Sequence, residues 1–240
     1  MKRYVMGLHC IDELVKHSPD RILKVFAAKN VLQKQIAKAL NREKIPIILK
    51  DKNSLTTLVQ SDSHQSIVAE VEAPQSYDLK DFLLNLRDKD KSCLLLLDNI
   101  NDPQNLGAIF RAADCFGVDA LIWSKNRGTD ITPVVSKVSS GASELVPSIK
   151  VSNLAQVLPL LQNEGFEVIS TALDSTAISL FDYKFQAKTA IVLGSEGRGV
   201  QPLILKKCDK IVYIPMFGKI DSLNVSQAAA VTLSHFAKNA

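Results

Sequence analysis

The sequence contains no long apolar run. Nowhere do eighteen consecutive apolar residues occur, the length that a helix needs to cross a lipid bilayer. The first ten residues, MKRYVMGLHC, include two basic residues but neither a long apolar stretch nor a small-residue cleavage site. We therefore expect no secretory signal and a soluble protein of the cytoplasm.

Closely spaced metal ligands are also missing. The four cysteines (Cys10, Cys93, Cys115 and Cys208) are far apart in the sequence, and the four histidines are equally scattered. No pair of cysteines has the spacing of a zinc site or a redox motif. We predict buried, reduced thiols and no metal site.

Hydrophobic and charged residues occur in the proportions that are typical of a globular protein. Of the 240 residues, 46% are hydrophobic and 22% are charged, which excludes a disordered or collagen-like chain. This length is comfortable for two small domains.

The basic charge is confined to the first quarter of the chain. Residues 1–60 carry twelve Lys/Arg against five Asp/Glu, whereas residues 61–240 carry 17 against 20. Such a surface favours a polyanion, because each phosphate contact releases condensed counterions. A merely solvated basic face is the alternative. The candidate contacts to a polyanion in this region are Arg21, Lys24, Lys29, Lys34, Lys38 and Arg42.

Residues 1–73 predict a small α/β domain. Helical spacing occurs over 7–17 and 31–40, and strand patterns over 21–28, 45–50 and 66–72. The polar segment 74–92 follows, and we interpret it as a linker with one short helix.

Residues 93–240 predict a parallel sheet covered on both faces by helices, because apolar strands alternate there with helical patterns. The expected strands are 93–97, 119–123, 145–151, 166–172, 189–194 and 210–215. The expected helices are 106–116, 132–140, 152–164, 200–207 and 222–237. Ligands of such sheets bind outside the carboxyl ends of the strands, so the loops there are the candidate sites.

The first of these loops follows the strand 93–97. Asp102-Pro103 breaks the strand's continuation, and we expect Asn105 to cap the next helix. Arg111 lies four residues after Gly107, on the same helix face. Its guanidinium is expected to reach the mouth of the sheet and favour phosphate. An ordinary exposed arginine is the alternative.

The second loop, Leu193–Gly199, has three glycines in six residues, which lets the backbone approach a ligand closely. Its spacing is G-x-x-G-x-G rather than the dinucleotide pattern, and Glu196 stands inside it. In the third loop, 214–228, we expect Ser222 to cap the last helix. The first turns of that helix then hold Leu223, Asn224 and Ser226, beside free backbone amides.

Together the three loops resemble the SpoU (TrmH-like) family of RNA ribose 2′-O-methyltransferases in the SPOUT superfamily. The matching segments are Asp102-Pro-x-Asn105-x-Gly107 with Arg111-Ala112, Leu193-Gly-x-Glu196-Gly-x-Gly199, and Ile214-Pro-Met-x-Gly218 with Ser222-Leu-Asn224-Val-Ser226. Tyr4-x-x-Gly7-x-His9, His64-Gln65 and residues 137–144 resemble the branch that modifies a guanosine of 23S ribosomal RNA. Ser66 departs from that branch, where a glycine is usual.

The resemblance implies a C-terminal SPOUT domain with a deep trefoil knot and an N-terminal, RNA-binding domain similar to the ribosomal protein L30e fold. It also implies a homodimer through the C-terminal domain, whose active site borders the partner subunit. The implied cofactor is S-adenosylmethionine, without a metal. The residues implied to hold it are Thr171, Ala172, Leu193, Gly194, Glu196, Gly199, Ile214, Met216, Ser222 and Leu223.

The reaction implied is attack of a ribose 2′-hydroxyl on the sulfonium methyl group. A guanidinium is too basic to accept a proton readily, so our hypothesis is that Arg111 grips the adjacent RNA phosphate and stabilises the developing alkoxide. Asn105, Glu196, Ser222 and Asn224 would orient Arg111, the ribose and the nucleotide. A tRNA-modifying relative, a non-enzymatic RNA-binding protein and, more distantly, an oxidoreductase are the alternatives.

Overall fold

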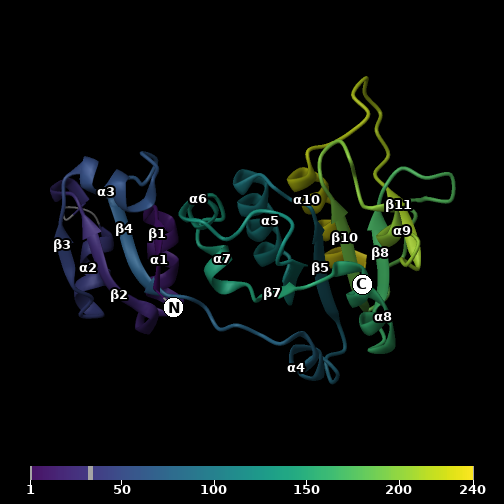
Figure 1. Cartoon of the computed structure of the whole chain (residues 1–240), viewed down its shortest axis with the longest axis horizontal. Coiled ribbons are helices and arrows are strands. Elements are labelled where there is room, and N and C mark those ends of the chain that lie inside the picture. Colours follow the sequence, from purple (N-terminus) through teal and green to yellow (C-terminus); the bar gives the residue numbers. More distant parts are fainter. Residues whose placement is uncertain (1, 32–34, 240) are drawn as a thin grey trace. The chain divides into compact units, whose positions relative to one another are not determined.

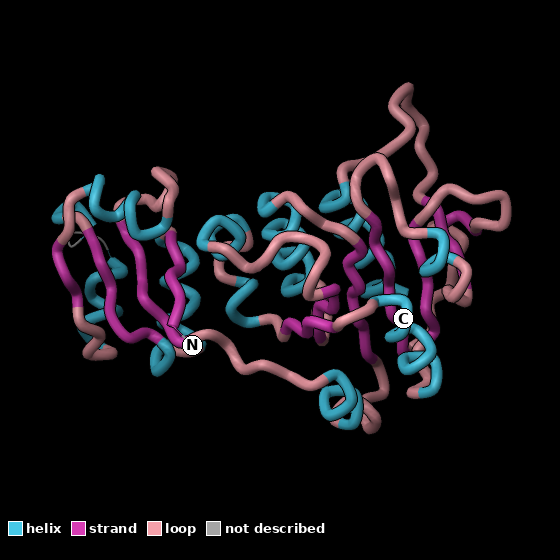
Figure 2. The backbone as a smooth tube through the Cα atoms, viewed as in Figure 1, coloured by secondary structure: helices cyan, strands magenta, loops and turns pink. Residues whose placement is uncertain are grey.

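The computed structural model describes residues 2–31 and 35–239. Its contacts divide the chain into two compact units, which are described separately and whose strands Figure 2 shows in magenta. Unit 1 comprises Met1–Gln75 and Asp130–Leu145, and unit 2 comprises Ser76–Thr129 and Val146–Ala240. The boundaries predicted from the sequence assign residues 130–145 to the second domain, whereas in the structure this segment packs with unit 1.

Unit 1 contains a four-stranded mixed sheet in the order β1-β4-β2-β3. Strand β4 is antiparallel to β1 and to β2, and β3 is parallel to β2. The strands are β1 (Lys2–Met6), β2 (Ile22–Ala27), β3 (Ile47–Leu49) and β4 (Ile67–Glu72). The helices are α1 (Leu8–His17), α2 (Gln35–Arg42), α3 (Lys52–Val59), α6 (Pro133–Val138) and α7 (Ala142–Leu145), with 3-10 turns at Pro19–Arg21 and Lys29–Val31.

The core of unit 1 lies between the sheet and α1 and α2, where Leu14, Leu40 and Ile67 are almost fully buried. The sequence predicts β2, β3, β4, α1 and the described part of α2. Strand β1 and helix α3 were not predicted, because neither KRYVM nor KNSLTTLV has a clear apolar period. Part of the predicted helix 31–40 lies outside the described residues.

Unit 2 confirms the predicted parallel sheet. Seven strands lie in the order β7-β6-β5-β10-β8-β11-β9, and every neighbouring pair is parallel. They are β5 (Ser92–Asp98), β6 (Ala120–Ser124), β7 (Ser148–Val151), β8 (Glu167–Thr171), β9 (Ile178–Ser179), β10 (Lys188–Gly194) and β11 (Lys210–Tyr213). Strand β9 was not predicted, since two residues carry no periodic signal.

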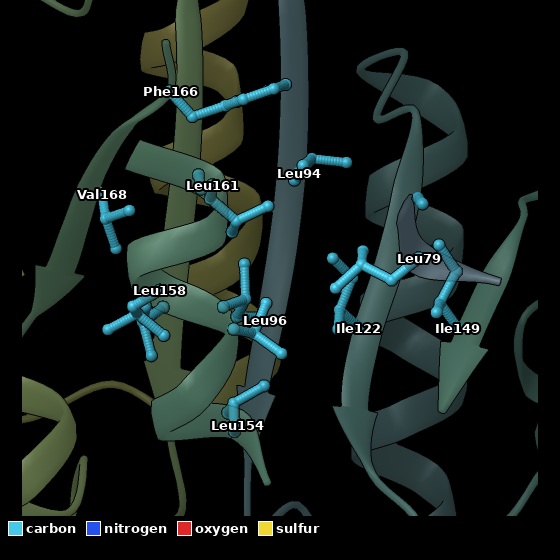
Figure 3. Close-up of a cluster of buried hydrophobic side chains, with 14 of the residues drawn as sticks. Leu79, Leu94, Leu96, Ile122, Ile149, Leu154, Leu158, Leu161, Phe166 and Val168 are labelled. Carbon is cyan, nitrogen blue, oxygen red and sulfur yellow. The ribbon is translucent and has the colours of Figure 1, made fainter. Parts of the chain in front are cut away.

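Helices cover both faces of this sheet, as the apolar strands require. On one face Leu158 and Leu161 of α8 pack over Leu96 of β5, and Figure 3 shows α10 behind the same strands. Helices α5 and α10 pack against each other, and Phe110 of α5 meets Trp123 of β6 edge to face. The helices of unit 2 are α4 (Leu79–Leu84), α5 (Pro103–Cys115), α8 (Leu154–Asn163), α9 (Pro202–Leu205) and α10 (Val225–Asn239).

Both predicted helix caps are wrong by a few residues. Helix α5 begins at Pro103, and the Asp102 carboxylate accepts from the backbone N–H of Gln104 at 2.9 Å. Asn105 is therefore the third residue of the helix. Helix α10 begins at Val225, and Asn224 accepts from the N–H of Ser226 at 2.8 Å, while Ser222 lies in the preceding loop. In each case the cap is the polar residue directly before the first helical residue.

The predicted burial of the thiols holds for Cys10 and Cys93, and burial raises the pKa of both. Cys208 is half-buried, and its pKa is raised to about 12 by burial and by the charge of Asp209. Cys115 is exposed at the end of α5, so the prediction is wrong for this residue. In residues 2–31 and 35–239, no helix has the length and apolar character that crossing a membrane requires.

Candidate active site

Three loops of unit 2 leave the carboxyl ends of neighbouring parallel strands. Strand β10 lies between β5 and β8, and β8 lies between β10 and β11. The loops after β5, β10 and β11 therefore share one edge of the sheet. Figure 1 shows the last of them in yellow-green, extending away from the sheet between β11 and α10.

The segments that follow β5, β10 and β11 each contribute one side chain to a polar cluster of Asn105, Glu196 and Asn224. Asn105 Nδ2 donates to Glu196 Oε1 at 3.0 Å, and Asn224 Nδ2 donates to the same oxygen at 2.5 Å. Asn224 Nδ2 also lies 2.9 Å from Asn105 Oδ1. Asn105 is buried, whereas Glu196 and Asn224 are exposed. The structure thus brings together three of the five residues predicted to be catalytic.

The turn that presents Glu196 requires glycine at specific positions. A Cβ on Gly194 would lie 2.1 Å from the carbonyl carbon of Gly199, because residues 195–199 fold back over the end of β10. The N–H of Gly199 donates to the carbonyl of Ser195 at 2.9 Å and closes the turn. Gly197 has a φ of 77°, which side chains rarely allow.

The other predicted catalytic residues lie outside this cluster. Arg111 is exposed on α5 and makes no hydrogen bond or ion pair with any described residue. The Ser222 hydroxyl donates to Asp221 Oδ1 at 3.2 Å and is exposed. Both side chains are therefore accessible, but neither is oriented by the residues around Glu196.

Five of the ten residues predicted to hold a cofactor lie at the ends of β8, β10 and β11. Thr171 ends β8 and Ala172 follows it, and the N–H of Ala172 donates to the carbonyl of Val212 at 3.0 Å. Leu193 and Gly194 end β10, and Ile214 follows β11. These five positions come from three adjacent strands and point to one binding region at the sheet edge.

The loop after β11 is unusually exposed and little bonded. Phe217 and Ile220 are 89% and 77% exposed. In the described part of the chain, the backbone N–H groups of Met216 and Leu223 donate no hydrogen bond. Half-buried Met216 and Leu223 thus offer free donors in the loop that leads to Asn224.

Sequence analysis missed a second polar chain at the same edge. Asp98, at the end of β5, is 2% exposed, and it accepts from Gln201 N at 2.8 Å and from Gln201 Nε2 at 2.5 Å. Arg127, in the loop after β6, donates to Gln201 Oε1. Ligands of parallel sheets bind outside the carboxyl ends of the strands, and the loop after β6 leaves such an end. The same argument would therefore have indicated Arg127 as a candidate site residue.

In unit 1 the predicted RNA contacts differ in exposure. Lys29, Lys38 and Arg42 are exposed, and Arg42 pairs with Glu43 at 2.8 Å. Lys24 is half-buried and pairs with Glu70 at 2.9 Å. Lys34 lies outside the described residues.

Arg21 belongs to a buried ionic cluster. Its guanidinium donates to the Glu144 carboxylate at 2.9 Å and to the carbonyl of Glu72 at 2.9 Å. Arg3 and Ser136 also donate to Glu144, at 2.6 and 3.1 Å, and the Glu144 side chain is fully buried. Arg21 therefore joins residues 130–145 to the sheet of unit 1 and is only partly accessible.

Family models match most of the chain. The model of the SpoU rRNA Methylase family covers residues 92–234. The chain belongs to this family. A second model, described as RNA 2′-O ribose methyltransferase substrate binding, covers residues 4–77. The resemblance predicted from the three loops is thus confirmed, and the cluster of Asn105, Glu196 and Asn224 lies within the SpoU methylase segment.

Relatives match this SpoU methylase over almost its whole length. The 23S rRNA (guanosine-2′-O-)-methyltransferase RlmB of Coxiella burnetii is 36% identical over 233 residues, 95% of this chain and 92% of the relative. The protein of the same name from Escherichia coli is 35% identical over 97% of each chain. The SpoU methyltransferase AviRb from Streptomyces viridochromogenes, solved in complex with AdoMet, has a TM-score of 0.80 at 24% identity and covers 99% of this chain and 90% of its own. This last likeness shows the fold.

No three His, Cys, Asp or Glu side chains among residues 2–31 and 35–239 are placed to hold a metal ion.

Proposed function

We propose that this chain transfers a methyl group from S-adenosylmethionine to the ribose 2′-hydroxyl of a guanosine in 23S ribosomal RNA. The observation that carries the proposal is the similarity to relatives of that activity, 35–36% over at least 95% of this chain. The assembled cluster of Asn105, Glu196 and Asn224 supports it. A ribosomal RNA substrate agrees with the cytoplasmic location expected from the sequence, which stays a prediction.

The residues at the sheet edge fit S-adenosylmethionine. Its adenosine and methionine groups need backbone donors and acceptors and a close approach of the chain. The free N–H groups of Met216 and Leu223 supply donors, and the glycine turn 194–199 supplies bare backbone. We propose that Thr171, Ala172, Leu193 and Ile214 complete this site, which Glu196, Gly199 and Ser222 border.

When bound, S-adenosylmethionine supplies the electrophilic methyl group that the 2′-hydroxyl attacks. A hydroxyl is a weak nucleophile at neutral pH, so the chain must stabilise negative charge on that oxygen. We propose that Arg111 does so while it holds the adjacent phosphate, because its guanidinium is exposed and pairs with no described residue. Asn105, Glu196 and Asn224 would hold the ribose, and Ser222 would complete the site. Such positioning can contribute about 7–11 kcal/mol.

Unit 1 would bind the RNA substrate. The match of residues 4–77 to a substrate-binding model and the exposed charges of Lys29, Lys38 and Arg42 support this role. We retain Lys24 and Lys34 as candidate contacts. Arg21 is the weakest candidate, because Glu144 and Glu72 occupy its guanidinium. The L30e-like fold of this part remains part of the proposal.

The trefoil knot and the homodimer also belong to the proposal. Membership in the SpoU family and the fold shared with AviRb support a knotted arrangement of the loops after β10 and β11. The exposed Phe217 and Ile220 support a partner subunit that borders the active site.

The test is methyl transfer from labelled S-adenosylmethionine to unmodified 23S rRNA and, in parallel, to unmodified tRNA. Transfer to one guanosine ribose of the rRNA is expected. Transfer to tRNA alone would retain the chemistry and overturn the substrate. Assembling ribosomal particles are tested as a further substrate. Cofactor binding without methyl transfer to the rRNA, the tRNA or these particles would indicate an RNA-binding protein that has kept the fold.

A further inference from the structure

The polar chain Asp98–Gln201–Arg127 separates two cavities of unit 2. One has a volume of about 600 Å³ and is lined by Glu196 and Arg198. The other, of about 400 Å³, lies at the ends of β6 and β7 and is lined by Asn126, Asn153 and Leu203. Arg127 and Gln201 line both, so the two cavities are neighbours that share a wall. Of the residues assigned above to methyl transfer and cofactor binding, Glu196 and Gly199 line the first cavity and none lines the second.

The loop that carries Arg127 is fixed against Ile100, in the segment that follows β5. The N–H of Thr129 donates to the carbonyl of Ile100 at 2.8 Å. Gly128 has a φ of 100°, and a Cβ there would lie 2.9 Å from the same carbonyl oxygen. With the bond from Arg127 to Gln201, these contacts hold the guanidinium at the wall. Its position is a property of the fold rather than of a free loop.

The charge of Arg127 is not neutralised by a carboxylate. Both oxygens of Asp98 accept from Gln201, and no ion pair among the described residues includes Arg127. Only one of the five N–H bonds of the guanidinium is used by Gln201. The remaining donors suit a phosphate, which arginine binds with two parallel hydrogen bonds.

The smaller cavity suits a nucleobase. Its volume lies within the range of about 300–1,000 Å³ that small-molecule sites have. Leu203 is 60% exposed and offers an apolar face, while Asn126 and Asn153 offer amide groups. Proteins read single-stranded RNA by splaying a base out, stacking it and bonding its edge. An RNA strand whose target ribose lies at Glu196 would extend past Arg127, because Arg127 lines both the cavity of Glu196 and the smaller cavity.

We propose that the 400 Å³ cavity binds a nucleotide flanking the methylated guanosine, with Arg127 on its phosphate and its base against Leu203. This inference rests on the proposed function and adds a subsite to it. It makes the nucleotide beside the target a determinant of substrate choice.

The experiment compares Arg127→Ala with Lys125→Ala in methyl transfer to a 23S rRNA fragment. Lys125 is an exposed base of the same loop that lines neither cavity, so it is a matched control. We expect Arg127→Ala to raise the KM for RNA about tenfold, since a charge-assisted contact is lost. Lys125→Ala is expected to stay within about twofold of the parent. Neither should change the Kd for S-adenosylmethionine or the Tm.

A second arm tests the base. An abasic residue at one flanking position should raise the KM of the parent protein, and this increase should shrink in Leu203→Asp. Equal KM values for Arg127→Ala and Lys125→Ala overturn the inference. It is also overturned if an abasic residue leaves the KM of the parent protein unchanged on both sides of the target guanosine. A parallel loss of cofactor affinity and Tm in Arg127→Ala also overturns it, because Arg127 then acts through Gln201 on the fold. Turnover of the parent protein on 23S rRNA tests the proposed function separately.

Discussion

The side-chain amide of Asn105 donates to Oε1 of Glu196 at 3.0 Å, across 91 residues of sequence. Asn224 donates to the same oxygen from the start of α10. One carboxylate thus links the segments after β5, β10 and β11 through side-chain hydrogen bonds. Loss of that carboxylate releases two amides together, so its effect should exceed that of a single hydrogen bond.

Glu196→Ala is expected to lower kcat by about 100-fold, since each bond to a charged acceptor contributes about 1.5–3 kcal/mol. Glu196→Gln keeps an oxygen that can accept from Asn105 and Asn224, so an intermediate activity is expected. Single-turnover methylation measures both. Equal losses in the two variants would show that the negative charge matters and not the hydrogen bonds.

Arg111→Ala and Arg111→Lys should each lower kcat strongly, by about 100-fold for alanine, because lysine cannot reproduce two parallel bonds to a phosphate or alkoxide. Arg111 is exposed and binds no described residue, so the Tm and the Kd for S-adenosylmethionine should not change. Asp114→Ala, on the exposed side of the same helix, is the control. Near-full turnover of Arg111→Lys contradicts the role proposed for Arg111.

Gly194→Ala should prevent the turn 195–199 from closing. The added Cβ would lie 2.1 and 2.3 Å from backbone atoms of Gly199 and Val200, which cannot rotate away as a side chain would. We expect a destabilisation of about 1–3 kcal/mol or more in urea unfolding, together with lost cofactor binding. Gly218→Ala is the matched control, since no atom lies within 4 Å of its Cβ position. Similar behaviour of the two variants would be incompatible with this geometry.

Much of the parallel sheet could be predicted, because strands such as β5 and β10 are buried on both faces and consist of unbroken apolar runs. The edge elements β1 and β9 could not, since short or charged strands carry a weak pattern. The three site loops were found from chemistry and position. The residues that cap α5 and α10 were misassigned, because several polar residues lie near the start of each helix. Only the backbone conformation determines which of them is the cap.

Ionic contacts between residues that are far apart in the chain could not be predicted from the sequence. Arg21 stands in a basic segment and was predicted to bind RNA, yet its partner Glu144 is 123 residues away. A charge count describes a surface and cannot show which charges are paired inside it. The polar chain of Asp98, Gln201 and Arg127 was missed for a related reason, since its members come from three separate segments of the sequence.

Glu144→Ala should destabilise unit 1 by about 3–5 kcal/mol, because it leaves the charges of Arg3 and Arg21 without their buried partner. Urea unfolding measures the change. Glu43→Ala removes the exposed pair with Arg42 and should cost about 0–1 kcal/mol. A cost for Glu144→Ala as small as that of the control would show that Arg3 and Arg21 find other partners.

His64 should make the stability of unit 1 depend on pH. It is fully buried, its Nδ1 accepts from the N–H of Ser66, and its Nε2 bonds Thr56. Burial lowers the pKa of His64, and the charges of Lys52 and Lys137 lower it further, against the opposing charge of Asp62.

The unfolded chain therefore takes up the proton first as the pH falls below about 6.5, so the free energy of unfolding should decrease from pH 7.5 to pH 5.5. His64→Gln should flatten this dependence in urea titrations, whereas His17→Gln, at an exposed histidine, should keep it. A parent protein equally stable at both pH values would mean that the folded chain protonates His64 as readily as the unfolded one.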